Sequence, residues 1–96
     1  MKWIENIRLL TSYGGLKTAI EITVQRLIDI EGHSKNVEIH LLQNALYEGD
    51  ISVILMWENE RKPVKSREGL LLAENLQAYG PVNHTVWHMI PYKKQM

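Results

Sequence analysis

The strongest constraint in the sequence is the run ISVILMW at 51–57, in which Ser52 is the only polar residue. β-Branched and aromatic side chains favour strands, and a run that is apolar at nearly every position is typical of a strand buried on both faces. We therefore predict a central strand over 51–57, with the remaining elements supplying its neighbours in a sheet.

Three further segments alternate between apolar and polar residues, as half-buried strands do. This alternation predicts strands over 3–10, 37–43 and 83–90. Each of them carries polar side chains on one face, so each has a face that can meet solvent or a partner.

Two segments repeat apolar residues every three or four positions, as amphipathic helices do. The first is expected to end at Gly32, and its apolar stripe consists of Leu16, Ala19, Ile20, Val24, Leu27 and Ile28. The second is expected to begin at Ser66, whose hydroxyl can cap a helix, and to end at Gly80-Pro81. Its apolar side consists of Gly69, Leu72, Ala73, Leu76 and Tyr79.

The order strand, helix, strand, strand, helix, strand predicts an α+β, ferredoxin-like βαββαβ fold. Right-handed crossovers place both helices on one face of a four-stranded antiparallel sheet, with the first and third strands in its centre. We expect one domain over 1–91 and a C-terminal tail over 92–96.

Composition narrows the possible partners. The chain has 96 residues, with 11 Lys and Arg against 11 Asp and Glu, and it has no cysteine. A chain without excess positive charge is not expected to bind nucleic acid, and one without cysteine has no disulfide or thiolate metal site. Glu5 and Arg8 interrupt the first apolar stretch, so we expect no signal peptide and no membrane partner, and we predict a cytoplasmic protein.

The two helices can cover only one face of the sheet, yet the third strand is apolar on both. Ile54 and Met56 lie on one face of it, and Val53, Leu55 and Trp57 lie on the other. An exposed apolar face usually marks an interface, so we predict a homodimer that packs sheet against sheet. The alternative is a monomer whose open face is merely somewhat apolar.

The third strand ends in Met56-Trp57-Glu58, and a polar loop and an amphipathic helix follow it. With the small size and the element order, this pattern resembles the dimeric α+β barrel superfamily, and within it the antibiotic-biosynthesis-monooxygenase-like proteins, from Trp3 to Ile90. The resemblance implies a barrel shared by two chains. In some members it implies oxidation of aromatic polyketides by molecular oxygen without a cofactor, and in others haem degradation.

The haem-degrading branch uses an Asn on the first strand, a Trp on the third and a His on the second helix. Asn6 and Trp57 match the first two, but the helix 66–79 contains no histidine. We therefore expect no cofactor.

The candidate catalytic residues are polar side chains of the predicted strands 3–10 and 37–43, on the faces opposite their apolar residues. If Ile7, Leu9 and their neighbours meet the helices, this set faces the barrel interior; it consists of Asn6, Arg8, Glu38 and His40. We predict catalytic roles for His40, Asn6 and Arg8, with His40 as the proton carrier near neutral pH. The alternative is a polar part of the dimer interface, with Arg8 paired to a carboxylate such as Glu38.

Aromatic and neighbouring residues supply the candidate ligand-binding set, which is Trp57, Met56, Trp87 and His84. Trp57 and Trp87 would form the walls of a pocket for an aromatic ligand; the alternative is plain packing. His84 and His88 lie about 13 Å apart along one strand, too far for one ion, so we predict no metal site. A cluster of His40 with His84 or His88 across a subunit seam stays open.

These features predict a small homodimeric α+β barrel that binds an apolar or aromatic small molecule. Cofactor-independent monooxygenation is the candidate activity. The alternative is a non-catalytic dimerisation or ligand-sensing module with the same fold.

Overall fold

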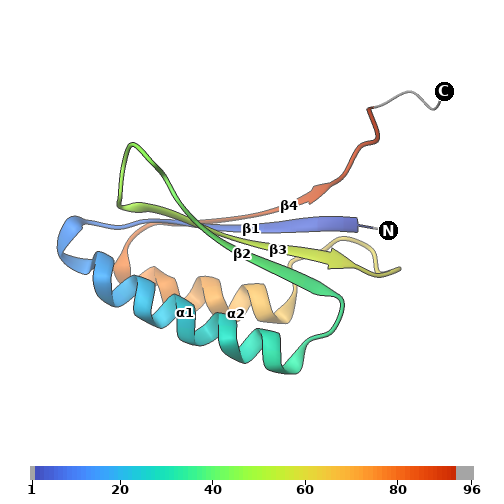
Figure 1. Ribbon diagram of the computed structural model, residues 1–96, viewed down its shortest axis with the longest axis horizontal. Coiled ribbons are helices and arrows are strands. Elements are labelled where there is room, and N and C mark those ends of the chain that lie inside the picture. The colour runs from blue at the N-terminus through green and yellow to red at the C-terminus, as the bar shows by residue number, and fades with distance from the viewer. Residues whose placement is uncertain (1, 93–96) are drawn as a thin grey trace.

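The computed structural model describes residues 2–92, and it has the predicted order of elements (Figure 1). The helices and strands are β1 (Lys2–Leu10), α1 (Leu16–His33), β2 (Val37–Gln43), β3 (Asp50–Glu58), α2 (Arg67–Leu76) and β4 (Val82–His88). Short 3-10 turns precede α1 at Tyr13–Gly15 and follow α2 at Gln77–Tyr79. Apart from Tyr92, the expected tail over 92–96 lies outside the described residues.

The four strands form one antiparallel sheet in the order β2-β3-β1-β4. The predicted topology is therefore confirmed, including the central places of the first and third strands. The register aligns His40, Ile54, Asn6 and Thr85 in one row across the four strands. Side chains in such a row point to the same side of the sheet.

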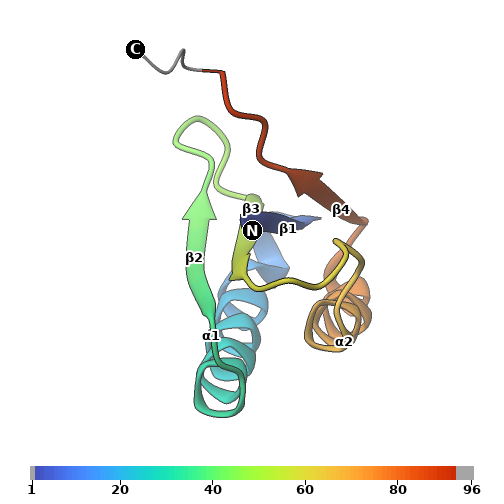
Figure 2. The same cartoon turned by 90° about the vertical axis from the view of Figure 1, so that its right-hand side faces the viewer.

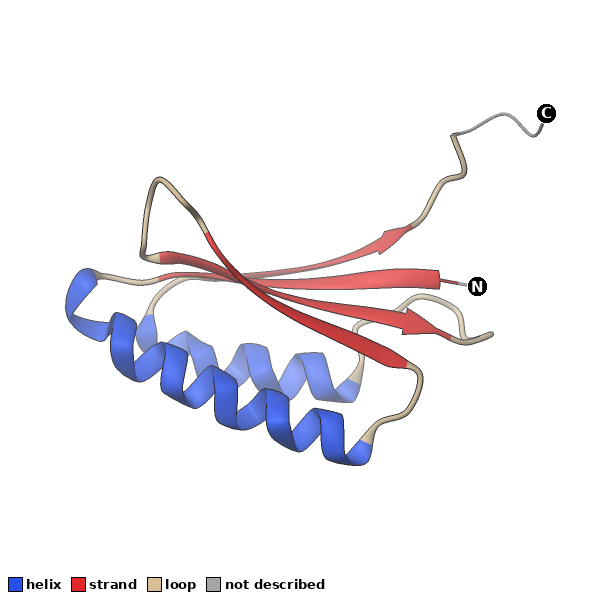
Figure 3. Cartoon of the chain, in the orientation of Figure 1, coloured by secondary structure: helices blue, strands red, loops and turns tan. Residues whose placement is uncertain are grey.

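Both helices cover the same face of the sheet, as Figures 2 and 3 show. The core lies between these two layers and consists of Trp3, Ile7, Leu9, Ala19, Ile30, Ile51, Val53, Leu55, Trp57, Leu72, Ala73 and Leu76. The other face, which we call the open face, has no layer over it in the described chain. The connection 44–49 and residues 89–92 both project on the open side (Figure 1).

The predicted stripe of α1 is partly wrong. Val24 and Ile28 are exposed, whereas Thr23 and Ile30 are buried. Thr23 tolerates burial because its hydroxyl donates to the carbonyl of Ala19 at 2.7 Å. The face of α1 that packs against the sheet is therefore rotated about the helix axis from the most apolar face of the helix.

The expected end of α1 at Gly32 is also wrong, because the helix continues through His33. The left-handed residue that follows it is Asn36, with φ 62°, a conformation that asparagine tolerates better than most residues. Neither helix within residues 2–92 is long and apolar enough to cross a membrane.

The residues predicted to begin and end α2 have the expected roles, with a serine cap at the start and Gly80 after the last turn. Ser66 caps the helix, since its hydroxyl accepts from the amide of Gly69 at 2.9 Å. After the last turn, Gly80 has φ 151°, and a Cβ there would lie 2.0 Å from the carbonyl oxygen of Leu10. Only glycine allows the chain to pass this close to β1 before it enters β4.

Candidate functional site between the sheet and the second helix

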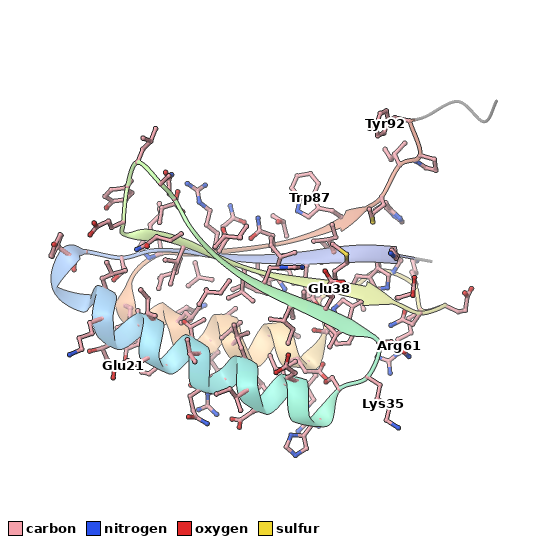
Figure 4. All side chains as sticks on the ribbon, viewed as in Figure 1. Glu21, Lys35, Glu38, Arg61, Trp87 and Tyr92 are labelled. Carbon is pink, nitrogen blue, oxygen red and sulfur yellow. The ribbon has the colours of Figure 1, made fainter. Side chains whose placement is uncertain are left out.

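The sheet divides the predicted site residues between its two faces. Alternate residues of a strand point to opposite sides, and the buried residues of β1 and β3 define the side of the helices. Trp57 and His84 lie on the helix side, and the other five lie on the open face: Asn6, Arg8, His40, Met56 and Trp87. Figure 4 shows Trp87 pointing away from the helices. The prediction that Trp57 and Trp87 form the walls of one pocket is therefore wrong within a single chain.

A buried carboxylate, Glu5, is the centre of the helix-side cluster. Glu5 is fully buried in the middle of β1. Two N–H donors reach it, the indole Nε1 of Trp57 at 2.8 Å and the backbone N–H of Ser66 at 3.0 Å, and the Nε2 atom of His84 lies 2.7 Å away. Hydrogen bonds to a buried carboxyl group offset the cost of its burial.

The beginning of α2 is shaped to receive this carboxylate. Ser66 caps the helix with its hydroxyl and presents its own backbone N–H to Glu5. The positive end of the helix dipole lies at the same place and favours a negative charge. A Cβ on Gly69 would lie 2.2 Å from Oε2 of Glu5 and 3.0 Å from the ring of His84, so a glycine is needed there for the side chains to meet.

His84 has one ring nitrogen engaged and one without a partner. Nε2 contacts Oε2 of Glu5, while Nδ1 is buried and has no hydrogen-bond partner among the described residues. If Nε2 carries the proton that Glu5 accepts, Nδ1 of the neutral ring is a lone-pair acceptor. This is the arrangement in which a carboxylate orients an imidazole as a general base.

Trp57 connects this pair to the aromatic part of the core. Its ring stacks on that of Trp3, with centroids 5.8 Å apart and planes inclined by 23°. Trp3 in turn donates from Nε1 to Oδ1 of Asn59 at 3.0 Å. Both indole N–H groups therefore have acceptors, and the Trp57 ring is fixed beside Glu5.

The open face carries a second set of polar contacts. Arg8 donates to both carboxylate oxygens of Asp50 at 2.8 Å, and Asn44 donates to Asp50 at 3.0 Å. These hydrogen bonds lower the pKa of Asp50 to about 2, and the hydrogen bond with Arg8 makes the largest contribution to this shift. The same pair raises the pKa of Arg8.

Within one chain, Arg8 thus pairs with the carboxylate of Asp50 and not with that of Glu38. Glu38 instead pairs with His40, whose Nε2 atom lies 2.6 Å from its carboxylate. A residue two positions along the same strand is closer to Glu38 than β1 is, because β3 lies between β1 and β2. Nor do His40 and His84 share a face, since His84 is held on the helix side by Glu5.

A hollow of about 500 Å³ lies along the beginning of β4. The residues that line it are Arg8, Leu10, Lys65, Pro81, Val82, Asn83 and His84. His84 thus belongs both to the buried cluster and to the wall of an open hollow, and 6% of its side chain is exposed.

Glu5, Ser66 and Gly69 were not among the site residues predicted from the sequence. The signal for Glu5 was present, because it replaces an apolar residue in the alternation of Trp3, Ile7 and Leu9 on the buried face of β1. A charged residue at such a position needs partners when buried. The need for Gly69 has no signal in the sequence, because it depends on the distance between α2 and β1.

The whole chain was compared with protein-family models, curated proteins and solved structures. No family model matches it, and no curated protein matches it. Solved structures do match. A protein of Nitrosomonas europaea named as an antibiotic biosynthesis monooxygenase has a TM-score of 0.71 and 9% identity, over 93% of this chain and 90% of that one.

Two further structures cover nearly all of both chains. Rv0793 from Mycobacterium tuberculosis has a TM-score of 0.67 and 13% identity, over 98% of this chain and 100% of that one. SnoaB, a cofactor-independent oxygenase from Streptomyces nogalater, has a TM-score of 0.62 and 12% identity, over 98% of each chain. The resemblance to antibiotic-biosynthesis-monooxygenase-like proteins is confirmed at the level of the fold.

Proposed function

We propose that this chain forms a homodimer through its open face and that each copy binds an apolar or aromatic small molecule beside Glu5 and His84. The proposed reaction is a cofactor-independent monooxygenation. The observation that carries this proposal is the buried Glu5–His84 pair, in which Nδ1 of His84 has no partner within residues 2–92. A substrate hydroxyl would supply that partner.

In this reaction the main role of the protein is to position a general base beside the substrate. Nδ1 of His84 accepts a proton from an acidic hydroxyl or C–H of an aromatic substrate, and Glu5 stabilises the imidazolium that results. The electron-rich anion then reduces molecular oxygen. The keto tautomer of a hydroxylated aromatic ring has a ring CH₂ group. Overall, this CH₂ group and O₂ give a carbonyl group and water: two C–H bonds break, one C=O bond forms, and the second oxygen leaves with both hydrogens. The substrate itself is the reductant.

The open face supports the homodimer. Ile4, Ile54 and Met56 are half-buried in its middle, and Leu42 and Trp87 are exposed around them. The projecting segments on the same side add exposed apolar residues, namely Leu46, Tyr47, Met89, Ile90 and Tyr92. At about 25 cal/mol per Å² of apolar surface removed from water, covering such a face stabilises the dimer by several kcal/mol.

Oxygen uptake tests the activity. The protein is incubated with hydroxylated naphthalenes and anthracenes in an oxygen electrode, beside His84→Gln, His40→Gln and, as a matched control, His33→Gln. His33 lies at the exposed end of α1, with its ring on a backbone carbonyl. We expect uptake that His84→Gln reduces at least tenfold and His33→Gln leaves unchanged, with thermal unfolding checking that each variant is folded.

The other outcomes separate the remaining alternatives. A loss of uptake with His40→Gln alone would move the chemistry to the open face, where His40, Asn6 and Arg8 are the predicted residues. Binding without uptake across the whole panel would contradict the monooxygenase and favour a ligand-sensing module with the same fold.

A further inference from the structure

The hollow beside β4 has an unusual balance of charge. Among the described residues, its lining includes the cations Arg8 and Lys65 but no aspartate or glutamate. The chain as a whole has equal numbers of acidic and basic residues, so this local excess is not a reflection of net charge.

The two cations are not equivalent. Arg8 is neutralised by Asp50, which accepts both of its hydrogen bonds at 2.8 Å. Within residues 2–92, Lys65 forms no ion pair, and it lies directly before Ser66, whose backbone N–H donates to Glu5. The uncompensated positive charge of the hollow therefore belongs to Lys65, one residue from the buried cluster.

The rest of the lining suits the body of an organic molecule. Leu10, Pro81 and Val82 provide apolar surface, and the amide of Asn83 can donate or accept a hydrogen bond. Such a mixture of apolar walls and a few polar groups is typical of small-molecule sites. His84 lies in the same wall with 6% of its side chain exposed, so a molecule held in this hollow lies beside the residue that pairs with Glu5.

We propose that the small molecule is an aromatic acid with one carboxylate, which pairs with Lys65 while the aromatic ring lies against the apolar wall toward His84. This inference rests on the proposed function and narrows its substrate class to anionic aromatics. Lys65 is a specificity residue here and takes no part in proton transfer.

Calorimetric titration tests this with a matched pair of ligands. The first is a hydroxynaphthoate whose hydroxyl and carboxylate lie at opposite ends of the ring system, and the second is its uncharged methyl ester. An ion pair at a partly exposed site changes affinity by about two- to fivefold, and salt screens it. We expect the acid to bind more tightly than the ester by about this factor, with the preference declining as sodium chloride is added.

Two lysine variants provide the control. Lys65→Gln should remove the preference for the acid and leave the affinity for the ester unchanged. Lys35→Gln makes the same change of charge in the turn between α1 and β2, where Figure 4 shows Lys35 pointing outward, and should alter neither affinity. Equal binding of acid and ester, unaffected by Lys65→Gln, would overturn this inference and leave the proposed function standing. Binding of neither ligand would count against both.

Discussion

The carboxylate of Glu5 and the imidazole of His84 lie 2.7 Å apart on the helix-facing side of the sheet, although 79 positions separate them in the chain. β1 and β4 are neighbours in the sheet, and the first turn of α2 closes over both side chains. The pair is thus a product of the topology, and its surroundings can be tested one contact at a time.

Replacing Glu5 by glutamine should destabilise the protein. The amide has the same shape, but its NH₂ group must face either Trp57 Nε1 or the Ser66 amide, both of which are donors. Leaving a buried donor unsatisfied costs about 1–3 kcal/mol, measurable as a loss in the free energy of unfolding by urea. Glu21→Gln on the exposed side of α1 (Figure 4) should change stability by less than about 0.5 kcal/mol. Equal effects of the two substitutions would show that Glu5 is not held as described.

Two glycine-to-alanine substitutions should change the stability of the protein in opposite directions. Gly69→Ala places a Cβ against Glu5 and His84, and overpacking of this kind costs about 1–3 kcal/mol. Gly32→Ala meets no atom within 4 Å and should stabilise α1 by up to about 1 kcal/mol, because alanine loses less backbone entropy. Thermal unfolding of both variants measures the contrast. A harmless Gly69→Ala would mean that α2 can move away from β1 freely.

Asp50 should give the protein a stability that is lost in acid. Its pKa in the folded state is lowered to about 2 from an ordinary 3.8, chiefly because Arg8 hydrogen-bonds the carboxylate. A group with a depressed folded-state pKa contributes its full stability above the unfolded-state pKa, and that contribution disappears as the pH falls through the folded-state value. Stability should therefore decline between about pH 4 and pH 2 more steeply in the native protein than in Asp50→Asn.

The partner residue provides a second variant for the same prediction. Arg8→Gln removes the largest cause of the shift, so its stability should also depend less on pH in this window. Urea unfolding at several acidic pH values measures all three proteins. The same slope in all of them would assign the acid sensitivity to other carboxylates.

A charge on the open face should separate the proposed dimer. Trp87 on this face is 56% exposed, and Ile28 of α1, in a hollow beside the edge strand β2, is 57% exposed. Trp87→Glu should lower the mass measured by light scattering toward that of one chain, because a buried unpaired carboxylate is strongly unfavourable. Ile28→Glu should leave the mass of the native protein unchanged. A native protein that already has the mass of one chain at micromolar concentration would contradict the dimer.

Sequence periodicity was sufficient to predict the sheet order because three strands alternate clearly and the run at 51–57, which is apolar throughout except for Ser52, requires two neighbours. It was insufficient for α1, where Val24 and Ile28 are more hydrophobic than Thr23 and yet are exposed. The hydroxyl of Thr23 donates a hydrogen bond to the carbonyl of Ala19 on the same helix, so Thr23 can be buried despite its polar group.

The site was harder to predict than the fold because it depends on contacts across elements. The alternation correctly grouped Asn6, Arg8 and His40 on one face. It does not specify that Arg8 would select Asp50, a residue at the edge of the predicted strand, or that His84 would meet Glu5. Those pairs depend on register and on the approach of α2, which no local pattern encodes.

The stacked indoles of Trp3 and Trp57 make the buried cluster visible in solution. Two coupled chromophores at 5.8 Å split their electronic transitions, which adds an exciton couplet to the circular dichroism of the folded chain. Because Trp57 is also hydrogen-bonded to Glu5, that couplet would report on the surroundings of the carboxylate without any added label. The third tryptophan, on the opposite side of the sheet, lies outside this couple and leaves its fluorescence to report separately on the open face.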